Sequence, residues 1–354
     1  MRVSTNMIHS TSFDAIAKHQ NDLLRIQEQL STGKKVNRPS DDAVGITQIH
    51  KLTQTINTID QYAKNGIYAK SQLVLEETAI TNTVDVLQRV RELAVQMSTD
   101  TYNADQRKQT AAEVQQLMLH VKSIMNQKNS DGEHMFAGNN VNLLPFVDDP
   151  ANPGFLTYIG NLAVADGGKP EANFGGRFVK IGFDVTNELK PDDQFNMSRV
   201  RITDAGSRVF GMDLDNPTAS LGQIGINDAN STPPSQVPAD ATTIDGNIYN
   251  VMQVMYLRLM DGERPGDDIL DSLKQSVTNM SENLAVIGGR QNRIEAQYDA
   301  GESFKMALTE RRMNIEELDL VKGISDFTVK QNALQMAQQV FTRVQQMSLF
   351  DYLR

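Results

Sequence analysis

Histidines are the residues of this chain that most readily suggest catalysis or metal binding, and there are five of them. They are His9, His19, His50, His120 and His134. A helical zinc-hydrolase site needs two histidines four residues apart with a glutamate between them. No two of the five have that arrangement, and the chain contains no cysteine that could supply a thiolate. We therefore expect these histidines to lie on helix faces or at the surface.

Acidic residues offer one further candidate site, the segment Asp213-Leu214-Asp215-Asn216, which begins like a calcium-binding loop. Such a loop requires glycine at its sixth position and glutamate at its twelfth. Thr218 occupies the sixth position and the glutamate is absent, so a plain turn is expected. Neither a phosphate-binding P-loop nor a Gly-x-Ser-x-Gly nucleophile motif occurs. We predict no catalytic, metal-binding or cofactor-binding residue and no enzymatic activity.

The longest regular pattern lies between Leu270 and Ile315. Apolar residues, with one glycine, recur there every seven positions, at Leu273, Met280, Ile287, Ile294, Gly301, Leu308 and Ile315. A strict seven-residue repeat keeps one helix face against a partner, so we predict a continuous helix of about 70 Å. A second track turns polar at Gln291, Lys305 and Arg312. This change indicates a face that is partly hydrated or shared with other subunits.

Amphipathic spacing and capping residues predict the remaining helices. They are expected at about residues 12–32, 42–99, 104–128, 243–260 and 323–350. Gly66 is a candidate bend within the second of them. The first helix is expected to pair with the last, and the second and third with the long helix.

The composition changes between residues 141 and 241, which contain 9 of the 11 prolines. Short β-type runs occur there at residues 155–159, 177–181, 195–197 and 199–202. The predicted fold is therefore mainly α with an inserted β-rich domain, on a long antiparallel helical stalk made from N- and C-terminal segments. The expected domains are residues 1–42 with 316–354 (terminal helices), 43–140 with 242–315 (stalk), and 141–241 (outward β-rich domain).

Charge and hydropathy narrow the range of partners. The net charge of −10 argues against general binding to nucleic acid or to an anionic membrane. No apolar run approaches the roughly 20 residues that span a bilayer. The N-terminus lacks a basic region followed by an apolar core, as a secretory signal peptide would have. We expect either a cytoplasmic protein or one exported by another route.

The two terminal helices are the strongest candidate for a functional surface. Their apolar faces lie at the chain ends, where domains usually fray. We predict that subunit contacts are made by Ile16, Leu23, Ile26, Leu30, Phe327, Leu334, Phe341, Val344 and Met347. The alternative is that these residues only join the two helices of a single chain.

Three segments together resemble the bacterial flagellin family: residues 30–42, 88–96 and 131–138. The first contains the family-signature loop, formed by Gly33, Asn37, Arg38, Pro39, Ser40, Asp41 and Asp42. One departure is Ala43, where relatives often carry proline. Both residues are tolerated at the start of a helix, so the resemblance is little affected.

The chain ends, residues 1–7 and 347–353, are more similar to the hook–filament junction members of this family than to its filament flagellins. The resemblance implies an extracellular structural subunit without cofactors, exported unfolded by the flagellar type III system. Its implied partners are copies of itself in a ring, the first hook-associated junction protein, flagellin, and an export chaperone on the C-terminal helix. No nucleic-acid or membrane partner is implied.

Two alternatives remain from the sequence. The chain could be a filament-forming flagellin, although its C-terminal ending argues against this. It could also be a cytoplasmic helical scaffold, which the missing signal peptide alone supports.

Overall fold

The computed structural model describes residues 5–169, 176–183, 198–212 and 244–352. The chain forms two compact units, residues 1–60 with 302–354 and residues 61–301. Two long helices, α2 (Ala43–Met97) and α6 (Asp267–Glu316), contribute residues to both units. The predicted fold class is confirmed, whereas the finer division into three domains stays a prediction. Within the described residues, no helix has the length and apolar character needed to cross a membrane.

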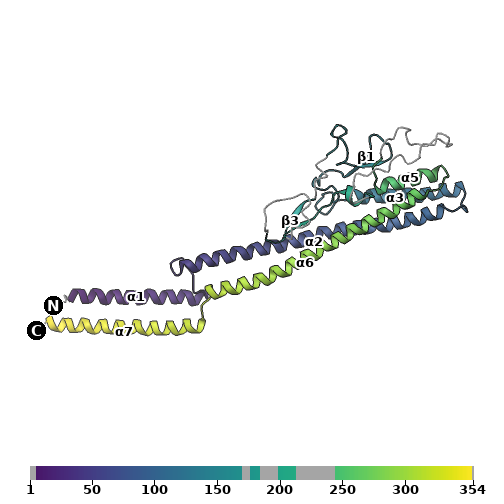
Figure 1. The fold of residues 1–354 in the computed structure, drawn as a ribbon. Helices are drawn as coiled ribbons and strands as arrows, with labels where there is room; N and C mark the ends of the chain where they lie inside the picture. Colours follow the sequence, from purple (N-terminus) through teal and green to yellow (C-terminus); the bar gives the residue numbers. More distant parts are fainter. Residues whose placement is uncertain (1–4, 170–175, 184–197, 213–243, 353–354) are drawn as a thin grey trace. The chain divides into compact units, whose positions relative to one another are not determined.

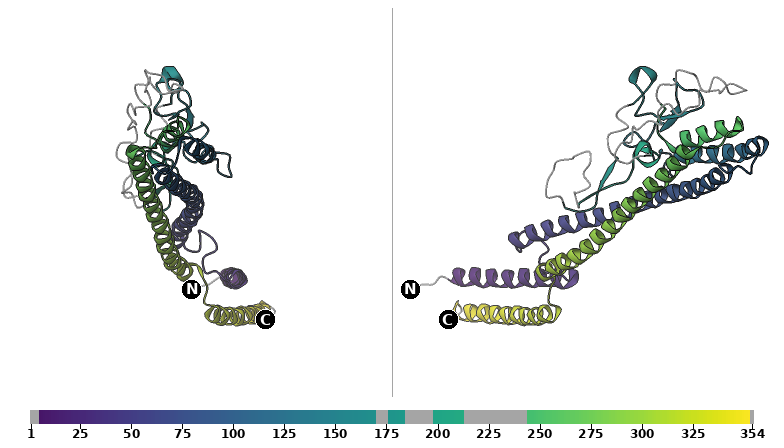
Figure 2. Two further views of the ribbon diagram at one scale, coloured as in Figure 1. Left: turned by 90° about the vertical axis from the view of Figure 1, so that its right-hand side faces the viewer. Right: turned by 45° about the vertical axis from the view of Figure 1, so that its right-hand side comes forward.

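The first unit contains α1 (Thr5–Thr32) and α7 (Leu320–Tyr352), which lie side by side and antiparallel (Figures 1 and 2). The predicted pairing of the first and last helices is therefore confirmed. Helix α1 begins at Thr5, earlier than the expected start near residue 12. The Thr11 hydroxyl donates a hydrogen bond to the Met7 carbonyl one turn earlier, as it does inside a helix.

Helix α2 runs unbroken past Gly66, so this glycine does not end or interrupt the helix. Gly66 is buried, and a Cβ atom at this position would lie 3.3 Å from Cγ2 of Ile294 in α6. This glycine therefore allows α2 and α6 to approach closely.

Helix α6 confirms the predicted long helix. Its seven-residue track is buried from Leu273 through Met280 and Ile287 to Ile294. Polar residues of the second seven-residue series, such as Gln291 and Lys305, have partners within the chain. Gln291 Nε2 donates to a Glu77 carboxylate oxygen at 2.7 Å, and Lys305 Nζ lies 2.7 Å from the Asp60 carboxylate.

Two shorter helices, α3 (Ala104–Met125) and α5 (Ile248–Met260), pack against each other. Helix α3 starts with a capping box, in which Asn103 and Gln106 each bond the other's backbone N–H. Helix α5 starts later than the expected Thr243, because the Asn247 side chain caps it by accepting from the Asn250 N–H.

The inserted region contains two antiparallel pairs of short strands. These are β1 (Phe146–Asp148) with β2 (Leu156–Tyr158), and β3 (Phe178–Lys180) with β4 (Arg199–Arg201). A 3₁₀ turn η1 (Val164–Asp166) and a short helix α4 (Gly206–Val209) complete it. Sequence analysis predicted β2, β3 and β4 but not β1, because the four residues between Pro145 and Pro150 give too little alternation. The predicted run 195–197 and the calcium-loop candidate 213–216 lie outside the described residues.

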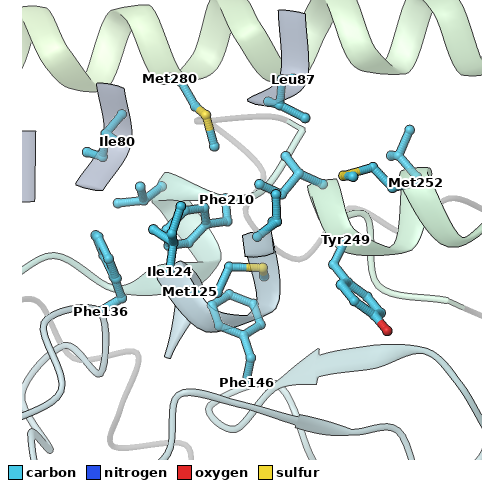
Figure 3. Packing of buried hydrophobic residues seen from close by; sticks show 14 of the residues in the cluster. Ile80, Leu87, Ile124, Met125, Phe136, Phe146, Phe210, Tyr249, Met252 and Met280 are labelled. Carbon is cyan, nitrogen blue, oxygen red and sulfur yellow. The ribbon is translucent and has the colours of Figure 1, made fainter. Parts of the chain in front are cut away.

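The core of the second unit forms where α2, α3, α5 and α6 meet the inserted region (Figure 3). Leu87 of α2 and Met280 of α6 are fully buried there. The Phe210 ring packs edge-on against Phe136 and Phe146, with centroids 4.6 and 5.8 Å away. The inserted region therefore shares a core with the helices and is not tethered only by its two ends.

We predict that Leu87→Ala lowers the free energy of unfolding by about 2–5 kcal/mol, because it removes apolar burial and leaves a cavity. Leu119→Ala is the matched control, since Leu119 of α3 is exposed and its truncation should change stability by less than about 0.5 kcal/mol. Denaturant titrations of both variants test this. Equal losses would show that this core is not close-packed.

Candidate subunit interface

Helices α1 and α7 are joined by polar as well as apolar contacts. Lys330 Nζ lies 2.8 Å from the Asp22 carboxylate, and this hydrogen bond lowers the pKa of Asp22. A Cβ atom added at Gly323, near the start of α7, would lie 3.0 Å from Cδ2 of Leu30, near the end of α1. The glycine therefore lets the two helices approach closely at this end of the pair.

The predicted interface residues have intermediate rather than full exposure. Ile26 is buried, and Ile16, Leu23, Leu30, Phe327, Leu334 and Phe341 are half-buried. Val344 and Met347 belong to α7, but their side chains lie outside the described residues. The half-burial indicates that much of this track already packs within the chain. A role in contacts with other subunits stays a prediction.

A second apolar stripe on α7 is far more exposed. Val329, Met336 and Val340 are 62%, 66% and 59% exposed. Their spacing of seven and four residues places them on one line along the helix, opposite the face that carries Phe327 and Leu334. Val344 and Met347 continue that line by spacing alone.

Helix α1 also carries large exposed side chains, Phe13 and Leu24, eleven residues apart and therefore on one face. Sequence analysis missed both of them, as well as Val329 and Met336. The signal was present as a second apolar line on each helix beside the first. The pair therefore presents apolar surface that its own packing does not cover, as protein–protein contact sites do.

The signature loop joins the end of α1 to the connection between α6 and α7. Gly33 ends α1 with φ of 70°, a left-handed conformation that glycine adopts without strain. Its carbonyl accepts from the Leu318 N–H at 2.9 Å, and the Lys35 N–H donates to the Glu316 carbonyl at 2.7 Å. These bonds hold the segments that precede α2 and α7 beside each other.

The acidic end of this loop organises the start of α2. One Asp41 oxygen accepts from the backbone N–H groups of Asn37 and Arg38, at 3.2 and 3.0 Å. One Asp42 oxygen caps α2 by accepting from Val44 and Gly45, at 3.0 and 2.8 Å.

The rest of the signature loop lies near the surface. The Arg38 guanidinium bonds Glu28 at 2.9 Å, which ties the loop back to α1. Pro39 and Ser40 are exposed at the tip of the loop. Ala43 is the first residue of α2, a position where proline would also fit.

One of the five histidines, His134, has a partner within the second unit. His134 is buried, its Nδ1 lies 2.9 Å from the Asn126 carbonyl oxygen, and burial lowers its pKa. Among the described residues, no group of three or more His, Cys, Asp or Glu could hold a metal ion.

Both the N-terminal and the C-terminal parts of the chain match known protein-family regions. Residues 3–141 match the bacterial flagellin N-terminal helical region, and residues 270–353 match the bacterial flagellin C-terminal helical region. The two regions include the signature loop and most of the terminal helix pair.

Whole-chain relatives agree with this assignment. The "Flagellar hook-associated protein 3" of Escherichia coli K12 is 26% identical over 99% of each chain, and the flagellin of Bacillus subtilis is 25% identical over 96% of this chain and 94% of its own. The crystal structure of flagellar hook-associated protein 3 from Legionella pneumophila shares the fold. Its TM-score is 0.53 at 19% identity, covering 75% of this chain and 99% of that one.

We predict that Asp42→Ala lowers stability by about 0.5–2 kcal/mol, because two N–H groups at the start of α2 lose their acceptor. Hydrogen exchange at Val44 and Gly45 should accelerate. Ser40→Ala, at an exposed position two residues earlier, is the control and should leave both amides unchanged. Unchanged exchange in Asp42→Ala would show that the cap is not stabilising.

Proposed function

We propose that this chain, which belongs to the bacterial flagellin family, is a structural subunit of the flagellum at the junction between hook and filament. Similarity to hook-associated protein 3 over nearly the whole chain supports this role. The single structural observation that carries the proposal is the uncovered apolar surface on α1 and α7. A helix pair with such a surface gains stability when neighbouring subunits bury it.

We further propose that copies of the chain form a ring, with the first hook-associated junction protein on one side and flagellin on the other. The terminal helices would supply the contacts between subunits, through both the half-buried track and the exposed stripe. The domain expected over residues 141–241 would face outward. In this role the subunit adapts one helical assembly to another and performs no catalysis.

The chain would act outside the cell, after export in an unfolded state by the flagellar type III system. The chain contains no cysteine and therefore no disulfide, which is compatible with this route. Before export, a cytoplasmic chaperone would bind the amphipathic C-terminal helix and cover its apolar residues. This part of the proposal derives from the family resemblance.

The second candidate is a filament-forming flagellin, which the match to Bacillus subtilis flagellin favours. A junction subunit and a filament-forming flagellin differ in whether copies of the chain continue to add to one another without limit. A junction subunit should not form long filaments when purified alone, whereas a flagellin should. Antibody labelling of isolated flagella separates them further, since a junction protein marks only the hook-proximal end. Absence from sheared flagella would instead support a cytoplasmic scaffold.

We predict that the double variant Val329→Asp, Met336→Asp abolishes filament attachment and motility while the monomer stays folded. Two charges on the exposed stripe oppose burial against another subunit, because an unpaired buried carboxylate is costly. Thr328→Asp, Gln335→Asp is the matched control, since it adds the same charges at the neighbouring exposed positions.

Motility on soft agar and the amount of filament protein in sheared preparations measure the effect. Circular dichroism and thermal unfolding of both purified variants show that folding is retained. Normal filaments in the stripe variant, or in a strain lacking the gene, would contradict the proposed function.

A further inference from the structure

Four ionisable side chains are buried together in the second unit, far along the chain from the terminal helices. Glu76 belongs to α2, Arg290 to α6, Arg201 to β4, and Asp204 to the segment after β4. They lie where the inserted region contacts the two long helices.

Asp204 is the centre of this cluster and is only 4% exposed. Arg290 binds it with both terminal nitrogens, at 2.5 and 3.2 Å, and the Arg201 guanidinium forms a further ion pair with it. Two guanidinium groups therefore surround one carboxylate, a geometry that favours its ionised form.

Glu76 is 2% exposed, and no N–H group in the described part of the chain donates to its carboxyl oxygens, whereas the Asp204 carboxylate lies within hydrogen-bonding reach. A buried ionised carboxylate without a partner is strongly destabilising. A neutral carboxylic acid removes most of this cost and can donate a hydrogen bond to a nearby carboxylate. The charged groups that face Glu76 are Asp204 and Arg201 from the inserted region and Arg290 from α6, with Arg208 adjoining Arg201.

Two further side chains of α6, whose charge does not change over the ordinary pH range, hold the same part of the inserted region. The Asn279 amide donates to the carbonyls of Arg208 and Gly211, at 3.1 and 2.6 Å, and Arg293 donates to the Arg199 carbonyl at 2.8 Å. These contacts do not depend on pH. Glu76 is therefore the group through which protons could act on this interface.

We propose that Glu76, Asp204, Arg201 and Arg290 form a proton-controlled latch between the inserted region and helices α2 and α6. In the latched state Glu76 carries a proton and Asp204 is ionised. When the pH rises and Glu76 loses its proton, two buried carboxylates compete for two guanidinium groups. The attachment of the inserted region to α2 and α6 then weakens.

The electrostatics give the direction of the effect. Burial, together with the Asp204 charge, raises the pKa of Glu76 well above its ordinary value of 4.5. Burial opposes ionisation of Asp204 too, but Arg290 and Arg201 outweigh it and lower the pKa of Asp204 from 3.8 to about 2.

Each shift acts on stability in its own pH range. The unfolded chain releases the Glu76 proton near pH 4.5 whereas the folded chain retains it, so stability falls as the pH rises above that value. The Asp204 contribution is complete above pH 3.8 and is lost as the pH falls towards 2. The cluster therefore stabilises the fold most between about pH 3.8 and pH 4.5. The loss of stability above this range is due to Glu76.

The ratio of unfolding constants between the wild-type chain and Glu76→Gln isolates this effect from all other titrating groups. Glutamine has the shape of the neutral acid and cannot ionise. We expect similar stability at pH 5 and a ratio that rises by about tenfold or more by pH 8, with the wild type the less stable. Glu282→Gln, at an exposed position of α6, is the control and should give a constant ratio. A constant ratio for Glu76→Gln would overturn the proposal.

Infrared spectroscopy tests the protonation state without depending on a variant that folds. The wild-type chain should retain the carbonyl-stretch band of a protonated carboxyl group at pH values where ordinary carboxyl groups have lost theirs, and this band should disappear as the pH rises further. If no band persists beyond the titration of the ordinary carboxyl groups, Glu76 does not hold its proton and the latch does not exist.

A second variant tests the role of the Asp204 charge. In Asp204→Asn the two guanidinium groups are free to pair with Glu76, so the persistent infrared band of the wild type should be lost. Hydrogen exchange at Ile202, corrected for its intrinsic pH dependence, should accelerate with pH in the wild type but not in Glu76→Gln. Exchange that is equal in the two proteins at every pH would contradict a latch at this interface.

Discussion

The second unit depends on the continuous apolar face of α6. A helix of 50 residues gains little from its own hydrogen bonds in water, so its stability must come from packing along its length. Leu273, Met280, Ile287 and Ile294 provide this packing at steps of seven residues. Gly66 lets α2 approach at the last of these positions, and α3, α5 and the inserted region complete the core around the first ones.

The terminal helices α1 and α7, unlike α6, do not bury all of their apolar residues within the chain. Two helices packed side by side cover one face of each, and both α1 and α7 are apolar on more than one face. Their mutual contact accounts for the half-burial of Leu23 and Leu334 but leaves Phe13 and Val329 in solvent. Apolar surface left in solvent in this way is typical of protein–protein contact sites, and this is why we propose the helix pair as the subunit interface.

Regular elements could be predicted from the sequence because their signals are local and repeated. The extents of α6 and α3 follow closely from the spacing of their apolar residues. Strand β1 could not be predicted, since Pro145 and Pro150 confine it to a run of four residues, whereas β2 and β3 lie within longer β-type runs. The partners of Gln291 and Glu76 could not be predicted either, because they depend on which distant segments meet. The signature loop was identified by resemblance, but its backbone bonds to residues 316–318 appear only in the structure.

The buried Asp204–Arg290 ion pair limits how the inserted region can be aligned along α6. A seven-residue repeat presents nearly the same apolar face after each two turns, so apolar packing alone would tolerate a slide of the inserted region by one repeat. Such a slide would place Asn283 or Gln297 opposite Asp204 in place of Arg290, and the buried carboxylate would lose its bidentate partner. Leaving a buried charge unpaired costs several kcal/mol, which is more than one apolar contact returns. The Asp204–Arg290 pair therefore fixes the register, and the second carboxyl beside it makes the same interface sensitive to protons.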